Sequence, residues 1–93
     1  MGKKSIVQKD GSRCFVCGRM TGLECHHILG GPNRKWSDAY GLTVMLCKEC
    51  HTGKNGAQYN RQLGDSMKRL AQIAFEARYS HDEWMKVFRK NYL

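Results

Sequence analysis

Long apolar runs and a balancing number of acidic side chains are both missing from this sequence. No hydrophobic stretch approaches the ~20 residues that a membrane-spanning helix requires. Near the N-terminus, Gln8, Lys9 and Asp10 stand where a signal peptide would need its apolar core. Internal repeats and low-complexity segments are also absent. These absences argue against a membrane or exported protein, and we expect a soluble, cytoplasmic chain with no membrane partner.

Acidic residues are scarce relative to basic ones. Eight Asp and Glu stand against sixteen Lys and Arg, which gives a formal net charge of +8. Such an excess favours a polyanionic partner, and nucleic acid is the first candidate. A basic surface that serves only solubility is the alternative, and charge alone does not decide between them.

The chain is too short for a large hydrophobic core. Its 93 residues form one domain. A chain of this length buries only ~60 to 65% of the surface that its unfolded form exposes, so apolar packing alone leaves it marginally stable. Its 41% hydrophobic and 26% charged residues are nevertheless typical of globular domains. We therefore expect a folded protein with an additional stabilising element.

Five cysteines provide that element. Without an export signal the expected compartment is reducing, which disfavours disulfides and favours metal ligation. Cys14 and Cys17 form one CxxC pair, and Cys47 and Cys50 form a second. Two such pairs supply the four tetrahedral thiolates that structural zinc prefers, so we predict one structural Zn²⁺ here. Four reduced core cysteines are the alternative, and the fifth, Cys25, is expected to be a buried core thiol outside the zinc shell.

Hydrophobic patterning predicts an α+β fold. Residues 23–29 and 42–46 are short apolar runs typical of strands. Residues 30–33 read Gly-Gly-Pro-Asn, which predicts a loop between the strands. Residues 1–13 are expected to form a loose basic arm, for which an ordinary frayed terminus and a contact to DNA are equally compatible readings.

Two helices are predicted in the C-terminal third. From Asp65 onward, apolar residues recur at steps of three and four, as in an amphipathic helix. Ser80 followed by Glu83 resembles a capping box that opens a last helix. Near the end of this helix, where its dipole favours cations, lie Lys86, Arg89 and Lys90. They are interpreted as a solvated helix face, with a nucleic-acid surface as the alternative. The expected core residues of the two helices are Met67, Leu70, Ala71, Ala74, Phe75, Trp84, Met85 and Phe88.

Three of the four histidines lie beside the cysteine framework. His26 and His27 are adjacent on the first predicted strand, and His51 directly follows Cys50. The four cysteines already satisfy one zinc, so these imidazoles indicate a second site. Neighbours on a strand point to opposite faces, so His26 and His27 are not both expected to face one metal. A hydrolytic site needs a cation ligand and a base, although each histidine taken singly is also compatible with a structural role.

The order of these motifs resembles the HNH, or ββα-metal, nucleases of the zinc-knuckle type. The resemblance implies one domain over residues 14–93, with a ββα-metal motif core in 14–55 and a helical extension in 65–93. By size the chain looks like the small stand-alone HNH proteins of phages and prophages, which implies a bacterial host cell. The motifs that carry the resemblance are Cys14-Phe15-Val16-Cys17, Cys25-His26-His27-Ile28 and Leu46-Cys47-Lys48-Glu49-Cys50-His51.

The resemblance also implies roles for individual residues. His27 would be the general base, and His26, His51 and Asn55 would hold a catalytic divalent cation. Mg²⁺ or Mn²⁺ is expected there, and Ni²⁺ or Zn²⁺ could substitute. The implied reaction is hydrolysis of a phosphodiester bond in DNA, with one strand nicked per site by a monomer or weak homodimer; RNA stays open as a partner. Phosphate contacts are expected from the basic residues Lys3, Lys4, Lys9, Arg13, Arg34 and Lys35.

The central asparagine of that family has no counterpart here, because Tyr40-Gly41-Leu42-Thr43 occupy its region. Gly41 has no side chain, so Asn33 or a backbone carbonyl is expected to orient His27. This departure supports an alternative function, a zinc-stabilised nucleic-acid-binding module with impaired catalysis. A purely structural zinc protein is disfavoured because it leaves the three histidines unexplained.

Overall fold

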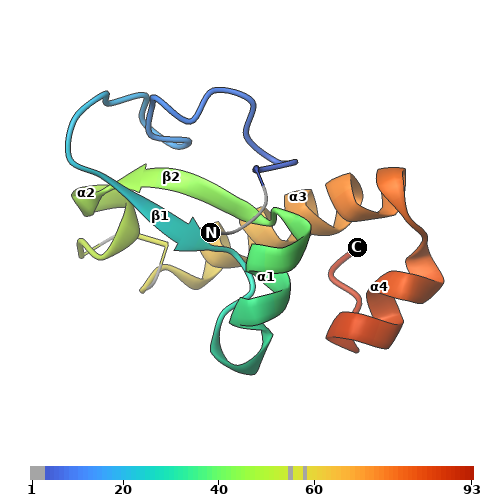
Figure 1. Ribbon diagram of the computed structural model, residues 1–93. Helices are drawn as coiled ribbons and strands as arrows, with labels where there is room; N and C mark the ends of the chain where they lie inside the picture. The colour runs from blue at the N-terminus through green and yellow to red at the C-terminus, as the bar shows by residue number, and fades with distance from the viewer. Residues whose placement is uncertain (1–3, 55, 58) are drawn as a thin grey trace.

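The computed structural model describes residues 4–54, 56–57 and 59–93 as a small α+β fold, as the patterning predicts (Figure 1). No helix in this part of the chain is both long and apolar enough to cross a membrane. The elements in chain order are β1 (Leu23–His27), the 3-10 turn η1 (Gly31–Asn33), α1 (Arg34–Tyr40), β2 (Thr43–Cys47), α2 (Lys48–His51), α3 (Arg61–Arg78) and α4 (His81–Phe88).

The two predicted strands pair as an antiparallel sheet. The register runs from Leu23 opposite Cys47 to His27 opposite Thr43. β1 ends two residues earlier than expected, and β2 is shifted by one residue toward the second CxxC pair. Strand β2 therefore ends on Cys47, the first cysteine of the second CxxC pair, and helix α2, which follows, carries Cys50.

Residues 30–41, which were expected to be a loop, contain helix α1. Pro32 lies in the first turn of η1, where its missing N–H removes no helical hydrogen bond. The buried Ser37 hydroxyl donates to the Leu29 carbonyl (2.8 Å) and accepts from the Leu29 N–H (2.9 Å). This tertiary contact fixes α1 against the end of β1, so the Gly-Gly-Pro-Asn segment precedes a helix instead of preventing one.

Gly41 ends α1 in the left-handed conformation, with φ of 72°. Its N–H bonds the Ser37 carbonyl, and its own carbonyl accepts from the Ile6 N–H at 2.9 Å. A Cβ at this position would collide with the carbonyl oxygen of Lys4. A side chain at position 41 would therefore displace the N-terminal segment.

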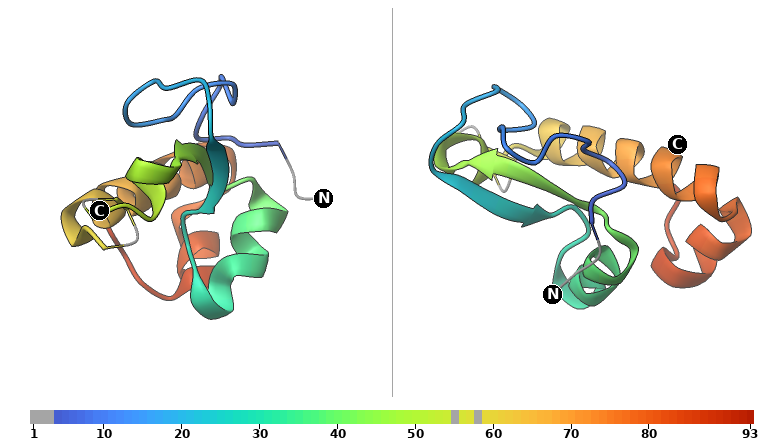
Figure 2. Two further views of the ribbon diagram at one scale, coloured as in Figure 1. Left: turned by 90° about the vertical axis from the view of Figure 1, so that its left-hand side faces the viewer. Right: turned by 45° about the horizontal axis from the view of Figure 1, so that its top comes forward.

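Residues 4–13 are not the loose arm that their composition suggests. The Ser5 hydroxyl donates to the Thr43 carbonyl at 2.5 Å. The buried Gln8 amide accepts from the Met45 N–H and donates to the Arg13 carbonyl, both at 2.7 Å. The segment lies beside β2 (Figure 2). It satisfies main-chain groups that an open strand edge would leave exposed.

Side-chain caps set where the two long helices begin. The Asn60 side chain accepts from the Leu63 N–H at 3.2 Å, so α3 starts four residues before the predicted Asp65. The Ser80 hydroxyl accepts from the Glu83 N–H at 3.1 Å, which confirms the cap predicted for α4.

The core lies between the sheet and the C-terminal helices, with α3 running across the back of the molecule (Figure 2). Leu70 was expected in this core but is 43% exposed, because it lies at the edge of the buried stripe of α3. The buried side chains that join the sheet to α3 and α4 are Leu42, Val44, Leu46, Met67, Ala71, Phe75, Trp84 and Phe88.

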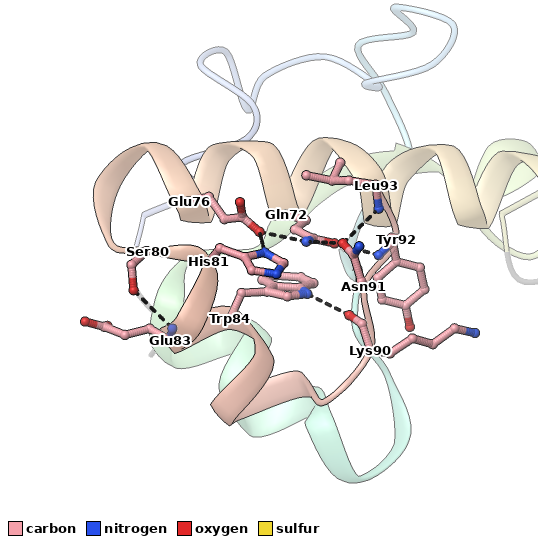
Figure 3. Close-up of polar contacts among 10 residues, drawn as sticks. All are labelled: Gln72, Glu76, Ser80, His81, Glu83, Trp84, Lys90, Asn91, Tyr92 and Leu93. Carbon is pink, nitrogen blue, oxygen red and sulfur yellow. Dashed lines mark hydrogen bonds and ion pairs between the residues drawn. The ribbon is translucent and has the colours of Figure 1, made fainter.

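The last five residues fold back onto α3 through partly buried polar contacts (Figure 3). The fully buried Gln72 amide donates to the Asn91 side chain (2.8 Å) and accepts from the Tyr92 N–H (2.7 Å). The Trp84 indole N–H donates to the Lys90 carbonyl at 2.8 Å. These bonds fix the segment that follows α4 against α3 and α4.

Candidate functional site

Four cysteine sulfurs come together where the first CxxC pair, Cys14 and Cys17, lies beside the start of α2. The Sγ atoms of Cys14, Cys17, Cys47 and Cys50 all lie within 4.8 Å of one another, and those of Cys17 and Cys47 are 3.6 Å apart. Tetrahedral zinc with Zn–S bonds of ~2.3 Å places its sulfurs ~3.8 Å apart. The cluster could therefore hold a metal ion and is compatible with the predicted structural zinc.

The first CxxC pair forms a tight turn against β2. The Gly18 N–H bonds the Cys14 carbonyl at 2.9 Å, and Gly18 adopts a positive φ of 81°. The Phe15 N–H donates to the Met45 carbonyl at 2.8 Å, which holds the turn beside the strand that carries Cys47. These backbone hydrogen bonds hold the first CxxC pair next to the second.

The electrostatics of the cluster also favour a cation. Burial raises the pKa of Cys14, but hydrogen bonds from the backbone of Cys17, Cys47 and Val16 outweigh it and lower that pKa to about 6. Burial, followed by contacts with the neighbouring thiols, raises the pKa of Cys50. Four thiolates therefore repel one another in this space unless a dication offsets their charge.

Cys25 is not the buried core thiol that we expected. It is exposed and lines the pocket that contains the histidines. Its exposure shows that β1 is open to solvent at this position. Its sulfur is not part of the four-cysteine cluster.

A pocket of about 480 Å³ brings the three histidines together. It lies between the end of β1, the start of α1, helix α2 and the first half of α3. The cations Arg34 and Lys68 also line it, and none of its described lining residues is acidic. Its polar groups suit an anion. The side chains that bear on its chemistry are His26, His27, His51, Arg34 and Lys68.

His26 and His51 form one side of this pocket. Their ring centroids are 5.1 Å apart in an edge-to-face arrangement. Glu24 shares the strand face of His26, and its Oε1 accepts from His51 Nδ1 at 2.9 Å. This bond assigns the Nδ1–H tautomer and leaves Nε2 of His51 as the free donor atom for a metal.

Burial is the largest cause of a low pKa at His26. Desolvation, then the charges of His51, His27 and Lys68, lower the pKa of His26 to about 4. Its imidazole is therefore neutral near pH 7. A neutral imidazole is the form that ligates divalent metals.

His27 points to a different partner, as expected for a strand neighbour of His26. Its Nε2 lies 3.3 Å from Oδ1 of Asp38 on α1, and its side chain is 17% exposed. With the Nε2–H directed to the carboxylate, Nδ1 is the basic nitrogen. The orienting contact comes from Asp38 and not from Asn33 or a backbone carbonyl, which were the expected candidates.

The basic residues predicted to contact phosphate do not form one surface. Lys4 and Lys9 line a small cavity of about 240 Å³ beside β2, and Arg13 pairs with Asp10 at 3.5 Å. Arg34 reaches the histidine pocket, whereas Lys35 lines a separate groove toward α4. Two residues of the predicted site, Lys3 and Asn55, lie outside the described part of the chain.

Three side chains of this site were missed by sequence reasoning. Glu24 stands two residues before His26, so strand alternation could have identified it. Asp38 gave no signal because its helix was expected to be a loop. Lys68 gave none because only the packing of α3 brings it to the pocket.

Apart from the four cysteines, no group of three or more histidines, cysteines or carboxylates in the described residues brings its ligand atoms together. In the described residues, the histidine pocket therefore contains no set of three such ligand atoms that converge. Comparisons with protein families, curated proteins and solved structures found no match to this chain.

Proposed function

We propose that this protein is a metal-dependent endonuclease of HNH type that hydrolyses a phosphodiester bond in DNA and nicks one strand per site. The observation that supports the proposal most is the histidine pocket, in which two paired imidazoles and a separately oriented third imidazole share one cavity with two cations. A structural histidine needs only a hydrogen-bond partner. Three of them in one cationic pocket are better explained by phosphate chemistry.

The proposed binding of the scissile phosphate uses both cations of the pocket. Arg34 and Lys68 approach from α1 and α3, so a phosphate between them would be held from two sides. His26 and His51 would hold the divalent cation, and their imidazoles suit Mn²⁺, Ni²⁺ or Zn²⁺ as well as Mg²⁺. When bound, that cation would offset the negative charge that develops on the phosphate and its leaving oxygen.

His27 is the proposed general base. Its Nδ1 takes a proton from water, the water oxygen forms a bond to phosphorus, and the bond from phosphorus to the leaving sugar oxygen breaks. Asp38 holds the ring through Nε2 and stabilises the imidazolium that forms. Neither step requires the asparagine that the chain lacks.

The four-cysteine cluster has a separate, structural part in this proposal. Zinc there would join the N-terminal knuckle, the end of β2 and the start of α2, which carries His51. Structural zinc sites contribute ~10 to 16 kcal/mol of binding free energy to folding. The metal would therefore fix His51 relative to His26 without taking part in cleavage.

A second candidate function is a nucleic-acid-binding module with impaired catalysis. The observation that favours it is Gly41, which stands in the region of the family's asparagine and has no room for a side chain. The two candidates agree on the fold and on DNA binding. They differ only in whether the pocket catalyses hydrolysis.

Plasmid nicking by the zinc-loaded protein tests the proposal. We expect relaxed circles to accumulate when Mg²⁺ or Mn²⁺ is added, and His27→Ala to lower the rate by the ~10² to 10⁴ that general-base catalysis contributes. His81→Ala is the matched control, because His81 pairs with Glu76 at 2.8 Å on the C-terminal helices and should leave nicking unchanged. A wild-type protein that binds DNA but never nicks it would favour the binding module.

A further inference from the structure

A second basic groove lies between the start of α1 and the end of α4. Its volume is about 520 Å³. Lys35 enters it from α1, and Lys86 and Arg89 enter it from α4 and its C-cap. None of the described lining residues is acidic. The cations at the end of α4, which were interpreted from the sequence as a solvated helix face, thus lie across a common groove from a cation of α1.

An exposed aromatic ring lines the same groove. Trp36 is 37% exposed, in contrast to Trp84, which is fully buried. The Lys35 ammonium lies 5.2 Å from the centre of the Trp36 ring. A partly exposed indole between cations is the combination that binds single-stranded nucleic acid, where bases stack on aromatic rings and phosphates contact basic side chains.

Arg89 occupies a backbone conformation that favours glycine. Its φ is 60°, and it is the only non-glycine residue with positive φ among those that the structure describes. It is also the C-cap of α4, a position at which glycine commonly ends a helix. Arg89 lines the groove, so this C-cap position adds a cation where glycine would end the helix with less strain.

Helix α1 connects this groove with the histidine pocket. Arg34, its first residue, lines the pocket, and the next two residues, Lys35 and Trp36, line the groove. Gly31 lines the pocket and Pro32 lines the groove, so the two cavities also adjoin at η1. A strand that leaves the pocket past Arg34 would continue directly into the groove.

We propose that this groove binds a single-stranded segment of DNA that flanks the scissile phosphate, with one base stacked on Trp36 and phosphates on Lys35, Lys86 and Arg89. The flanking position rests on the proposed nuclease function. The binding of single-stranded DNA rests only on the charge and the exposed indole of the groove.

Intrinsic tryptophan fluorescence tests the stacking contact. A short oligo(dT) is titrated into the zinc-loaded His27→Ala protein, which does not consume the ligand. We expect quenching from Trp36, whereas the buried Trp84 stays constant. Trp36→Phe should abolish the quenching but keep the affinity, and Trp36→Ala should weaken binding roughly 5- to 100-fold. Unchanged affinity in Trp36→Ala would overturn the stacking proposal.

Arg89→Gly tests the charge of the groove separately from its fold. Glycine relieves the positive φ, so this variant should melt no lower than the parent protein and yet bind oligo(dT) more weakly. The slope of log affinity against log salt concentration should be shallower than that of the parent by ~0.7, the value for one phosphate contact on a single strand. The matched control is Arg19→Ala, which removes one charge from the exposed knuckle loop and should bind nearly as the parent does. If Arg89→Gly and Arg19→Ala lost the same oligo(dT) affinity, general charge attraction would explain the binding and the groove would be refuted. Equal affinity of the protein for polyglutamate and for oligo(dT) would refute it as well.

Hydrolysis of bis(p-nitrophenyl) phosphate separates this proposal from the nuclease itself. This small diester occupies the pocket but not the groove, so its hydrolysis by the wild-type protein measures the chemistry of the pocket alone. Quenching without any diester hydrolysis would support the groove and refute the nuclease. Hydrolysis with no effect of Trp36→Ala or Arg89→Gly on oligo(dT) affinity would support the nuclease and refute the groove.

Discussion

Two carboxylates contact the imidazoles of the pocket. Glu24 bonds Nδ1 of His51, and Asp38 contacts Nε2 of His27. Each contact leaves one nitrogen of the ring available, in one case for a metal and in the other for a proton. The different roles proposed for the two histidines therefore follow from their partners and not from the histidines alone.

Removal of the Asp38 carboxylate should lower the nicking rate without weakening DNA binding. Asp38→Ala frees the His27 ring to rotate, so kcat is expected to fall by no more than His27→Ala itself causes, ~10² to 10⁴. Asp38→Asn keeps a hydrogen-bond acceptor, so its kcat should lie between those of the wild type and of Asp38→Ala. Single-turnover rates and filter-binding affinities measure the two effects separately.

Asp82→Ala is the control for the loss of one carboxylate, because Asp82 lies on α4 away from the pocket. A rise in KM with unchanged kcat in Asp38→Ala would contradict the positioning role.

At this scale the sequence predicted which cysteines come together better than it predicted the carboxylates that contact the histidines. CxxC spacing predicts the four cysteines, since two residues fix the separation of two sulfurs in any tight turn. Strand alternation predicts that His26 and His27 point apart. The contact of His27 with Asp38 depends on where α1 packs, and no local pattern encodes that.

At the scale of elements, the segments with a periodic apolar stripe were predictable and helix α1 was not. The two strands and the two long helices bury apolar side chains at regular intervals, so their patterns identify them. Helix α1 has no such stripe. It depends instead on the bonds of Ser37 to Leu29 and on its left-handed end at Gly41.

Introducing an asparagine at position 41 should destabilise the protein and not activate it. Gly41→Asn must place a Cβ against the Lys4 carbonyl, so we expect the free energy of unfolding to fall by about 1 to 3 kcal/mol. Urea denaturation of the zinc-loaded protein measures the change.

Gly30→Asn provides the comparison for that substitution, because a Cβ at Gly30 meets no atom within 4 Å. It should unfold near the wild-type midpoint. If Gly41→Asn were as stable as Gly30→Asn, or nicked faster than wild type, our account of this position would be wrong.

At the scale of the whole molecule, the described chain depends on contacts between its two ends and its centre. The N-terminal segment bonds β2, and the C-terminal segment bonds α3. The basic composition of residues 1–13 predicted the opposite for the N-terminal segment, because composition does not show which backbone groups a Ser or Gln side chain will satisfy. With so small a core, a zinc ion held by the four-cysteine cluster would be the decisive stabilising feature.

Cys47→Ser should therefore unfold the domain or remove its zinc. Loss of one thiolate weakens a site that supplies ~10 to 16 kcal/mol, which equals or exceeds the whole stability of most small domains. Cys25→Ser is the matched control, since Cys25 lies outside the cluster and is exposed. Zinc content and thermal melting by circular dichroism measure the outcome. Identical melting of the two variants would refute a structural zinc.

The most direct test of two separate metal sites is a titration of the zinc-loaded protein with Mn²⁺, followed by electron paramagnetic resonance and total metal analysis. The account predicts one tightly held zinc and one weaker Mn²⁺ per chain, with the Mn²⁺ lost and the zinc retained in His51→Ala. Absence of a second equivalent in the wild type, or loss of the zinc in His51→Ala, would contradict it.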